Sequence, residues 1–318
     1  MYWLHMITEE AADAFIRVAR SGTPRPATAR LLGGPQPTNR EWDEVPRKYP
    51  KLLLYIGFLR HARHQKSLIA DIFYACYALP CPRMRFTKPL PKFDPRSIPV
   101  LGVDTHLSGV PAQELTPQAL RQRFRHPPIW TPEHSVEKKF SNREPALAAV
   151  LLPLVMRGEL TLLLTQRADN MSTHSGQVAL PGGKTDASDH DAVDTALREA
   201  HEEIGLTREH VEVLGILPTY VTGSAFIITP VVALVQPGFA LQPNPAEVAD
   251  IFEVPLRYLM NPAHHQRHEF EFDGVLRQWL SMPYLDPAVA TDGRDATERY
   301  IWGATAGMLR NLYRFLSA

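Results

Sequence analysis

The sequence predicts a protein of the α/β class, because segments of strand character and segments of helical periodicity share its C-terminal half. The apolar run Ala146–Met156 has the composition of a buried strand. Asp191–Ile204 places apolar residues at helical spacing. Two more apolar runs, Val211–Leu217 and Ile227–Val235, predict further strands after that helix.

Local sequence signals predict a short helix, a tight turn, another strand and a loop or short helix around these elements. Thr116–Phe124 begins at a capping threonine and predicts a short helix. Leu160–Gln166 predicts a strand that follows a tight turn over Arg157-Gly158-Glu159. Pro243–Asp250 predicts a loop or a short helix.

The C-terminal region predicts a hairpin and a long helix. Glu269–Phe272 and Leu276–Leu280 flank Asp273-Gly274, a dipeptide typical of tight hairpin turns. Thr297–Leu316 predicts an amphipathic helix with the apolar stripe Ile301, Met308, Leu312 and Phe315. This helix is one candidate surface for a homodimer, and the alternative is that it covers the core of its own domain.

Composition and charge exclude several classes of protein. The 318 residues include 34 basic and 34 acidic side chains, and a formal net charge of zero provides no electrostatic basis for non-specific nucleic-acid binding. The apolar stretches Leu52–Leu59 and Ser67–Leu79 are shorter than the ~20 residues of a transmembrane helix. Glu9 and Glu10 lie where a signal peptide would be basic, so we expect a cytoplasmic protein.

Residues 1–83 differ in composition from the rest of the chain. They contain twelve basic and seven acidic residues and both cysteines, Cys76 and Cys81. Two cysteines make neither a disulfide framework nor a complete zinc site, so we expect free thiols. Two interpretations stay open: an appended domain, or upstream sequence translated before a true start at Met84. Residues 84–318 form the second unit in either case.

The helix predicted over Asp191–Ile204 carries a cluster of carboxylates. Asp191 lies at its start, where a carboxylate favours the helix dipole, and Gly205 can form the left-handed cap at its end. Glu199, Glu202 and Glu203 gather on one face, although like charges at this spacing repel. A hard divalent cation such as Mg²⁺ or Mn²⁺ would neutralise the cluster. The expected core face consists of Val193, Leu197, Ala200 and Ile204.

The residues around this helix resemble the Nudix family. The Nudix signature is G-x5-E-x7-R-E-U-x-E-E-x-G-U, with U apolar, and Arg198–Leu206 matches its second half in full. In the first half, counted from Gly183, Asp189 stands where a glutamate belongs, and one extra residue precedes the arginine. Asp189 or Asp191 is the expected substitute. The resemblance implies a Nudix fold, an α/β/α sandwich around a mixed β-sheet.

Within that family the chain resembles the coenzyme A diphosphatases. Their additional motif is L-L-T-x-R-[S/A]-x3-R-x3-G-x3-F-P-G-G, and Leu163–Gly183 follows it except at two positions. The second arginine is Ser172 and the phenylalanine is Leu180. The resemblance runs from about Phe93 to the C-terminus. It includes Pro218–Thr222, Glu247-Val248 followed by Val254-Pro255-Leu256, and Ile301–Ala306.

The resemblance implies a metal-dependent hydrolase. Glu199 and Glu203 would bind Mg²⁺ or Mn²⁺, with Glu202 assisting, and the metal would neutralise phosphoryl charge and help to deprotonate water. The general base stays open between Glu202, Glu203 and Glu247, a glutamate of a later loop that is also a possible metal ligand. Arg198 is expected to orient the glutamates through charge-assisted hydrogen bonds.

Four residues are expected on the substrate side. Gly182 and Gly183 would allow close approach of the backbone. Arg167, at the end of a predicted strand, would bind a phosphate, and Arg167 or Lys184 would compensate for the arginine missing at Ser172.

The histidines are expected to contribute less. His174 is either a phosphate contact or a structural loop residue. His264, His265 and His268 resemble a metal cluster, but they lie in a Pro/Gln/Arg loop without a carboxylate motif, so we expect solvated surface residues.

Three functions are compatible with these residues. The leading hypothesis is hydrolysis of coenzyme A or its thioesters to 3′,5′-ADP and a 4′-phosphopantetheine. The second is hydrolysis of ADP-ribose or a dinucleotide, because Ser172 removes an arginine that could recognise the 3′-phosphate. The third is a Nudix-fold binding protein without catalysis, although Arg198 and all three signature glutamates are present.

Overall fold

The computed structural model describes residues 94–138, 141, 143–169, 176–272, 275–287 and 296–318. The boundary expected near Met84, the two cysteines, Ser172 and His174 lie outside these residues, so the expectations attached to them stay predictions.

An eight-stranded mixed sheet forms the centre of the fold, and its main strand order is β4-β3-β2-β8-β6. Strands β2 (Ala146–Met156) and β8 (Phe226–Val235) run parallel, and their neighbours pair antiparallel. The other strands of the sheet are β3 (Leu160–Arg167), β4 (Val178–Ala179), β5 (Gly182–Lys184), β6 (Val211–Ile216), β7 (Tyr220–Val221) and β9 (Val248–Pro255). The mixed sheet implied by the family resemblance is therefore confirmed.

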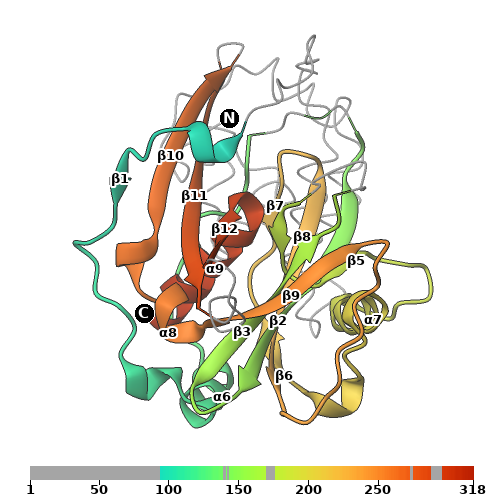
Figure 1. The fold of residues 1–318 in the computed structure, drawn as a ribbon. Coiled ribbons are helices and arrows are strands. Elements are labelled where there is room, and N and C mark those ends of the chain that lie inside the picture. The colour runs from blue at the N-terminus through green and yellow to red at the C-terminus, as the bar shows by residue number, and fades with distance from the viewer. Residues whose placement is uncertain (1–93, 139–140, 142, 170–175, 273–274, 288–295) are drawn as a thin grey trace, which may run out of the picture. The chain divides into compact units, whose positions relative to one another are not determined.

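Helix α7 (Ala192–Ile204) covers one face of this sheet (Figure 1). The Asp191 carboxylate caps its first turn by accepting a hydrogen bond from the Asp194 N–H at 2.9 Å, and Gly205 ends it with φ 71°. The expected core face is confirmed for Leu197, Ala200 and Ile204, which are buried beneath the helix, whereas Val193 is only partly buried at its edge.

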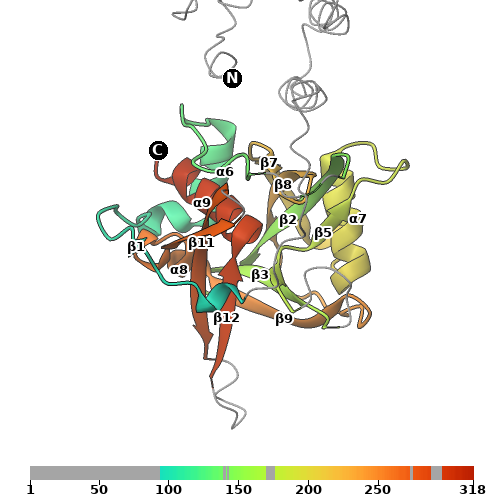
Figure 2. The same ribbon diagram turned by 90° about the horizontal axis from the view of Figure 1, so that it is seen from above.

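A second, four-stranded antiparallel sheet and helix α9 (Gly303–Leu316) lie on the other face. This sheet has the order β1-β10-β11-β12, and α7 and α9 lie on opposite sides of β2 and β3 in Figure 2. Leu152 and Leu162 of the central sheet share a core with Met308 and Leu312 of α9. The sequence did not predict the second sheet. Its strands are β1 (Gly102–Val103), β10 (Gln266–Phe272), β11 (Val275–Asp286) and β12 (Thr297–Trp302).

Two predicted elements are wrong in part. Thr297–Trp302 forms β12, because its aromatic and β-branched residues suit the pairing with β11, and the helix begins at Gly303. Val248–Asp250 belongs to β9, because pairing with β3 overrides a weak local preference for a loop. The hairpin predicted between Glu269 and Leu280 is confirmed and is longer at both ends.

The remaining helices are short. Helix α6 (Pro117–Arg125) is capped by Thr116 as predicted, and α8 (Leu256–Leu259) follows β9. Most of α9 is buried, so this helix covers the core of its own domain instead of offering a dimer surface. Within the described ranges, no helix is long and apolar enough to cross a membrane. Short 3₁₀ turns span Pro95–Ser97, Ala112–Leu115, Arg208–His210 and Pro262–His264.

Candidate active site

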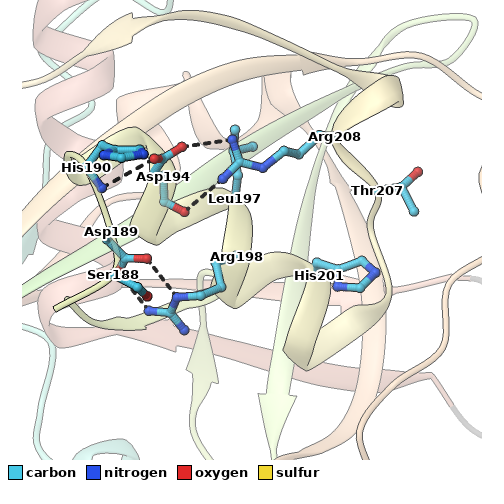
Figure 3. A pocket seen from close by; sticks show the side chains of 9 residues that line it. All are labelled: Ser188, Asp189, His190, Asp194, Leu197, Arg198, His201, Thr207 and Arg208. Carbon is cyan, nitrogen blue, oxygen red and sulfur yellow. Dashed lines mark hydrogen bonds and ion pairs between the residues drawn. The ribbon is translucent and has the colours of Figure 1, made fainter. Parts of the chain in front are cut away.

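Arg198 lies at the centre of a hydrogen-bond network on α7. Its Nε and Nη2 donate to the two carboxylate oxygens of Asp189 at 2.9 and 3.0 Å (Figure 3). Its Nη1 lies 3.0 Å from an oxygen of Glu199 and 3.0 Å from an oxygen of Glu202. The contacts expected between Arg198 and the glutamates are thus present. Asp189 accepts the bonds of this arginine, whereas Asp191 caps the helix.

Glu203 is the most buried of the three signature glutamates. Its side chain is 5% exposed, against 16% for Glu199 and 55% for Glu202. Glu203 Oε2 accepts a hydrogen bond from the Gly182 N–H at 3.0 Å. Burial raises the pKa of Glu203 to about 7, and the charges of Glu199 and Glu247 act in the same direction.

Gly182 and Gly183 belong to strand β5, which pairs with β2, and both pack directly against other groups. A Cβ on Gly183 would lie 2.5 Å from Oε2 of Glu199. Gly182 has a φ of 154°, and a Cβ there would overlap the backbone of Ala149 and Val150 on β2. A larger residue would therefore displace Glu199 or the strand, while the role expected for both glycines on the substrate side stays a prediction.

The loop before β9 brings Glu247 to the same region. The Asn244 N–H donates to the Glu203 carbonyl at 2.8 Å, which fixes the loop to the end of α7. The Ala168 N–H donates to the Glu247 carbonyl at 2.9 Å, which fixes it to the end of β3. The charge of Glu247 raises the pKa values of both Glu199 and Glu203, although burial of each carboxylate contributes more.

Arg167 and Lys184 differ in how they contribute. Arg167 ends β3, and its Nη1 lies 3.9 Å from Oε1 of Glu203. Its Nε is buried and has no hydrogen-bond partner among the described residues. The Lys184 carbonyl accepts a hydrogen bond from Nη2 of Arg198, and its ammonium lies 5.8 Å from the ring centroid of Phe226. The Arg167 guanidinium is therefore the one that faces Glu203.

The donor chemistry of this cluster fits a hard divalent cation. Burial and mutual repulsion disfavour the ionised forms of Glu199 and Glu203, and carboxylate oxygens are the ligands that Mg²⁺ and Mn²⁺ prefer. In the part of the chain that the structure describes, no three acidic, histidine or cysteine side chains are gathered closely enough to hold a metal as they stand. Glu199 is bonded to Arg198, and Glu203 to Gly182.

A surface pocket adjoins this network on the outer side of α7 (Figure 3). Its lining includes Asp189 and Arg198 together with His201 and an ion pair in which Arg208 Nη1 lies 2.8 Å from Asp194 Oδ1. Glu199 and Glu203 do not belong to this lining. The pocket therefore borders the supporting ion pair and not the glutamates themselves.

The expectation that the three later histidines are surface residues is wrong. His265 and His268 are 0% and 2% exposed, because His265 packs against Tyr313 of α9 and His268 lies on β10 beside β11. His265 Nε2 lies 2.8 Å from the Leu259 carbonyl, and His268 Nε2 lies 2.8 Å from Ser281 Oγ. Burial lowers the pKa of His265 to about 4. His264 stacks on Tyr258, so each histidine has its own structural partner.

Comparisons with known proteins agree with this geometry. The NUDIX domain family matches residues 145–287. An uncharacterized Nudix hydrolase NudL of Yersinia pestis (strain Pestoides F) is 37% identical over 170 residues, which cover 54% of this chain and 79% of that protein. NudL of Yersinia pseudotuberculosis (serotype O:1b, strain IP 31758) has the same values.

Two solved structures show weaker similarity. An Ap4A hydrolase of C. elegans in a binary complex is 21% identical and covers 34% of this chain and 80% of its own, with a TM-score of 0.31. The Nudix hydrolase RenU of M. smegmatis is 27% identical and covers 39% of this chain and 79% of its own, with a TM-score of 0.30.

A mixed sheet flanked by helices, with an R-E-x-x-E-E helix facing two glycines of a short strand, defines a Nudix-type enzyme site. The sequence matches show that this chain belongs to the Nudix hydrolase family. It is thus a hydrolase that acts on nucleoside diphosphate derivatives, and enzymes of this family generally use divalent metal ions. The relatives are named Nudix hydrolases, which favours an enzyme over the hypothesis of a binding protein without catalysis.

Proposed function

We propose that this enzyme hydrolyses the diphosphate of coenzyme A or of acyl-coenzyme A to 3′,5′-ADP and a 4′-phosphopantetheine. The observation that carries the proposal is the position of the diphosphatase-type motif Leu163–Gly183. Both ends of this motif contact the same carboxylate: Arg167 lies 3.9 Å from Glu203, and the Gly182 N–H donates to it at 3.0 Å. The motif that suggests the substrate therefore adjoins the signature helix.

Glu199 and Glu203 would hold Mg²⁺ or Mn²⁺, with Glu202 or Glu247 completing the ligand set. When bound, the ion supplies Lewis-acid polarisation of the phosphoryl oxygens and lowers the pKa of a coordinated water. Gly182 holds one oxygen of Glu203 in place through its N–H. Nη1 of Arg198 contacts one carboxylate oxygen of Glu199 and one of Glu202. Arg198 would therefore orient these carboxylates and would not contact the substrate.

Arg167 supplies positive charge on the substrate side. Its side chain is 22% exposed, and its guanidinium faces the most buried carboxylate of the site. A phosphate has the same preference for a planar, two-point donor, so Arg167 would bind the substrate diphosphate once a metal neutralises Glu203. Gly183 and Lys184 would line the same turn. The proton acceptor is one of Glu202, Glu203 and Glu247, of which Glu247 comes from a separate loop.

The test is a turnover assay of the full chain with Mg²⁺ or Mn²⁺, in which coenzyme A, dephospho-coenzyme A, ADP-ribose and NADH are compared. We expect 3′,5′-ADP from coenzyme A at the highest kcat/KM, no turnover in EDTA, and a large loss in Glu203→Gln. Unchanged activity of Glu203→Gln would refute the metal assignment. A higher kcat/KM for dephospho-coenzyme A would refute recognition of the 3′-phosphate.

The second function, hydrolysis of ADP-ribose or a dinucleotide, is favoured by one residue. Ser172 replaces the second arginine of the motif and removes a two-point donor for phosphate. The same assay separates the two functions, because ADP-ribose and NADH lack the 3′-phosphate of coenzyme A.

A further inference from the structure

Arg299 is a buried arginine behind the strand that ends in Arg167. It lies on β12 of the second sheet, and its side chain is 7% exposed. It follows the family-matched segment 145–287 in the chain. Its guanidinium lies 4.3 Å from the ring centroid of Phe252 on β9, which holds the planar group against the central sheet.

The guanidinium bridges two neighbouring strands of that sheet. Nη1 donates to the side-chain oxygen of Gln166 on β3 at 3.0 Å, and Nη2 donates to Asp250 on β9 at 2.5 Å. Gln166 and Asp250 are directly paired in the β3–β9 ladder. Nε reaches Asp286 of β11 at 3.3 Å, so one side chain joins three strands.

The bridged pair lies next to an irregularity in the ladder. The register shifts between Gln166 and Arg167, and Arg167 then pairs with Val248. One residue further along, the Ala168 N–H donates to the Glu247 carbonyl at 2.9 Å. The end of β3 and the start of β9 therefore leave the sheet next to the pair that Arg299 holds. These two chain ends carry Arg167 and Glu247 toward Glu203.

Gln166 also connects this clamp to the loop of the diphosphatase-type motif. Its side-chain amide donates to the Gly176 carbonyl at 3.3 Å, and the Arg167 N–H donates to the Gln177 carbonyl at 2.9 Å. Gln166 thus receives a hydrogen bond from Arg299 on one side and gives one to the motif on the other.

We propose that Arg299 is a positioning residue for the hydrolysis, which clamps Gln166 and Asp250 so that Arg167 and Glu247 meet Glu203 in a fixed geometry. The inference rests on the roles of Arg167 and Glu247 in the proposed function. A guanidinium suits this position because its fork can serve two acceptors on adjacent strands, which the single ammonium of a lysine cannot do in the same geometry.

The test compares Arg299→Lys and Gln166→Leu in the full chain with Arg157→Gln. Arg157 forms a more exposed ion pair with Glu253 on the same strand β9 but away from the irregularity, so this control removes an arginine contact to β9 without touching the site. Gln166→Leu leaves the Arg299–Asp250 pair intact, so this variant should fold even if Arg299→Lys does not. KM and kcat on the best substrate of the panel, the Kd for ADP and the melting temperature are measured for each variant.

We expect Arg299→Lys and Gln166→Leu to raise KM and the Kd for ADP between about 10-fold and 100-fold, while Arg157→Gln leaves both unchanged. In an Arg167→Ala background, Gln166→Leu should raise the Kd for ADP little further, because Arg167, the positioned side chain that binds phosphate, is already gone. A purely structural role would make the two effects multiply instead.

Two results would overturn the proposal in distinguishable ways. If Arg167→Ala raises KM but Arg299→Lys and Gln166→Leu do not, or if their effects simply multiply, the clamp is refuted and the proposed function stands. If Arg167→Ala and Glu247→Gln are both fully active, the substrate-side assignment and the clamp are refuted together.

Discussion

Asp189 and Arg198 form a two-point ion pair, with Arg198 Nε and Nη2 donating to the two Asp189 oxygens at 2.9 and 3.0 Å. Asp189 stands where the Nudix signature has a glutamate, and in this structure it is the aspartate that pairs with the signature arginine. The loop that carries Asp189 is itself closed by the Asp186 N–H, which donates to Asp189 at 2.9 Å. The hydrogen bonds from Arg198 hold the pKa of Asp189 well below its usual range.

Asp189→Asn is expected to lower kcat about 10-fold to 100-fold, because Arg198 loses the two-point partner that fixes its guanidinium and then holds Glu199 and Glu202 less firmly. Steady-state kinetics at saturating Mg²⁺ measures this. Asp191→Asn is the matched control, because asparagine caps a helix as well as aspartate does. An active Asp189→Asn together with an inactive Asp191→Asn would contradict the assignment.

Gly183→Ala is expected to reduce activity with little change in melting temperature. The added Cβ would lie 2.5 Å from a Glu199 oxygen, and the end of a glutamate side chain can move away without disturbing the fold. Gly158→Ala is the control, because a Cβ at Gly158 meets no described atom within 4 Å. Calorimetry and kinetics on both variants test the prediction, and equal activities would show that the position of Glu199 tolerates the methyl group.

Glu203 should make the metal-free protein less stable as pH rises. Its pKa is about 7 in the folded state against 4.5 for the ordinary side chain, so the folded protein binds the extra proton between these values. The stability that Glu203 contributes is therefore present below pH 4.5 and lost as pH rises through 7. Glu203→Gln mimics the protonated form and should be more stable than the wild type in EDTA at pH 8, by about 3 kcal/mol.

Urea unfolding in EDTA at pH 4.5 and pH 8 checks this difference, which should vanish at the lower pH. Added Mg²⁺ should stabilise the wild type at pH 8 more than Glu203→Gln, because a ligand that binds the folded state stabilises it. A difference that is the same at both pH values would mean that Glu203 is ionised throughout this range.

Arg310 should be the most costly single arginine of α9 to remove. It is 1% exposed and lies 2.9 Å from Asp104 and 2.7 Å from Glu133. Arg310→Leu would leave the buried Asp104 with Arg267 as its remaining cationic partner and should lower the free energy of unfolding by about 1–3 kcal/mol. Arg314→Ala, on the exposed side of the same helix, should change it little. Urea unfolding measures both, and equal losses would contradict the prediction.

Local signals in the sequence predicted the parts of this protein that depend on neighbouring residues. Helix α7 follows from its capping aspartate, its apolar spacing and Gly205, and the structure has each of these where expected. The carboxylates that share one face of α7, and the glycines that face them, follow from helical geometry and from the family signature. The first turns assigned to the C-terminal helix were wrong because pairing with β11 decides the conformation of Thr297–Trp302.

The sequence by itself determined the class of fold, the signature helix and the chemistry of its glutamates, because these properties depend on residues that lie close together in the chain. The tertiary structure decided which aspartate pairs with Arg198, how deeply Glu203 is buried and that Glu247 lies near it. It also decided that Arg299 reaches Gln166, which is 133 residues away. The reason is physical: desolvation and ion pairing depend on distances between side chains, and strands from separate parts of the chain set those distances only when they pair.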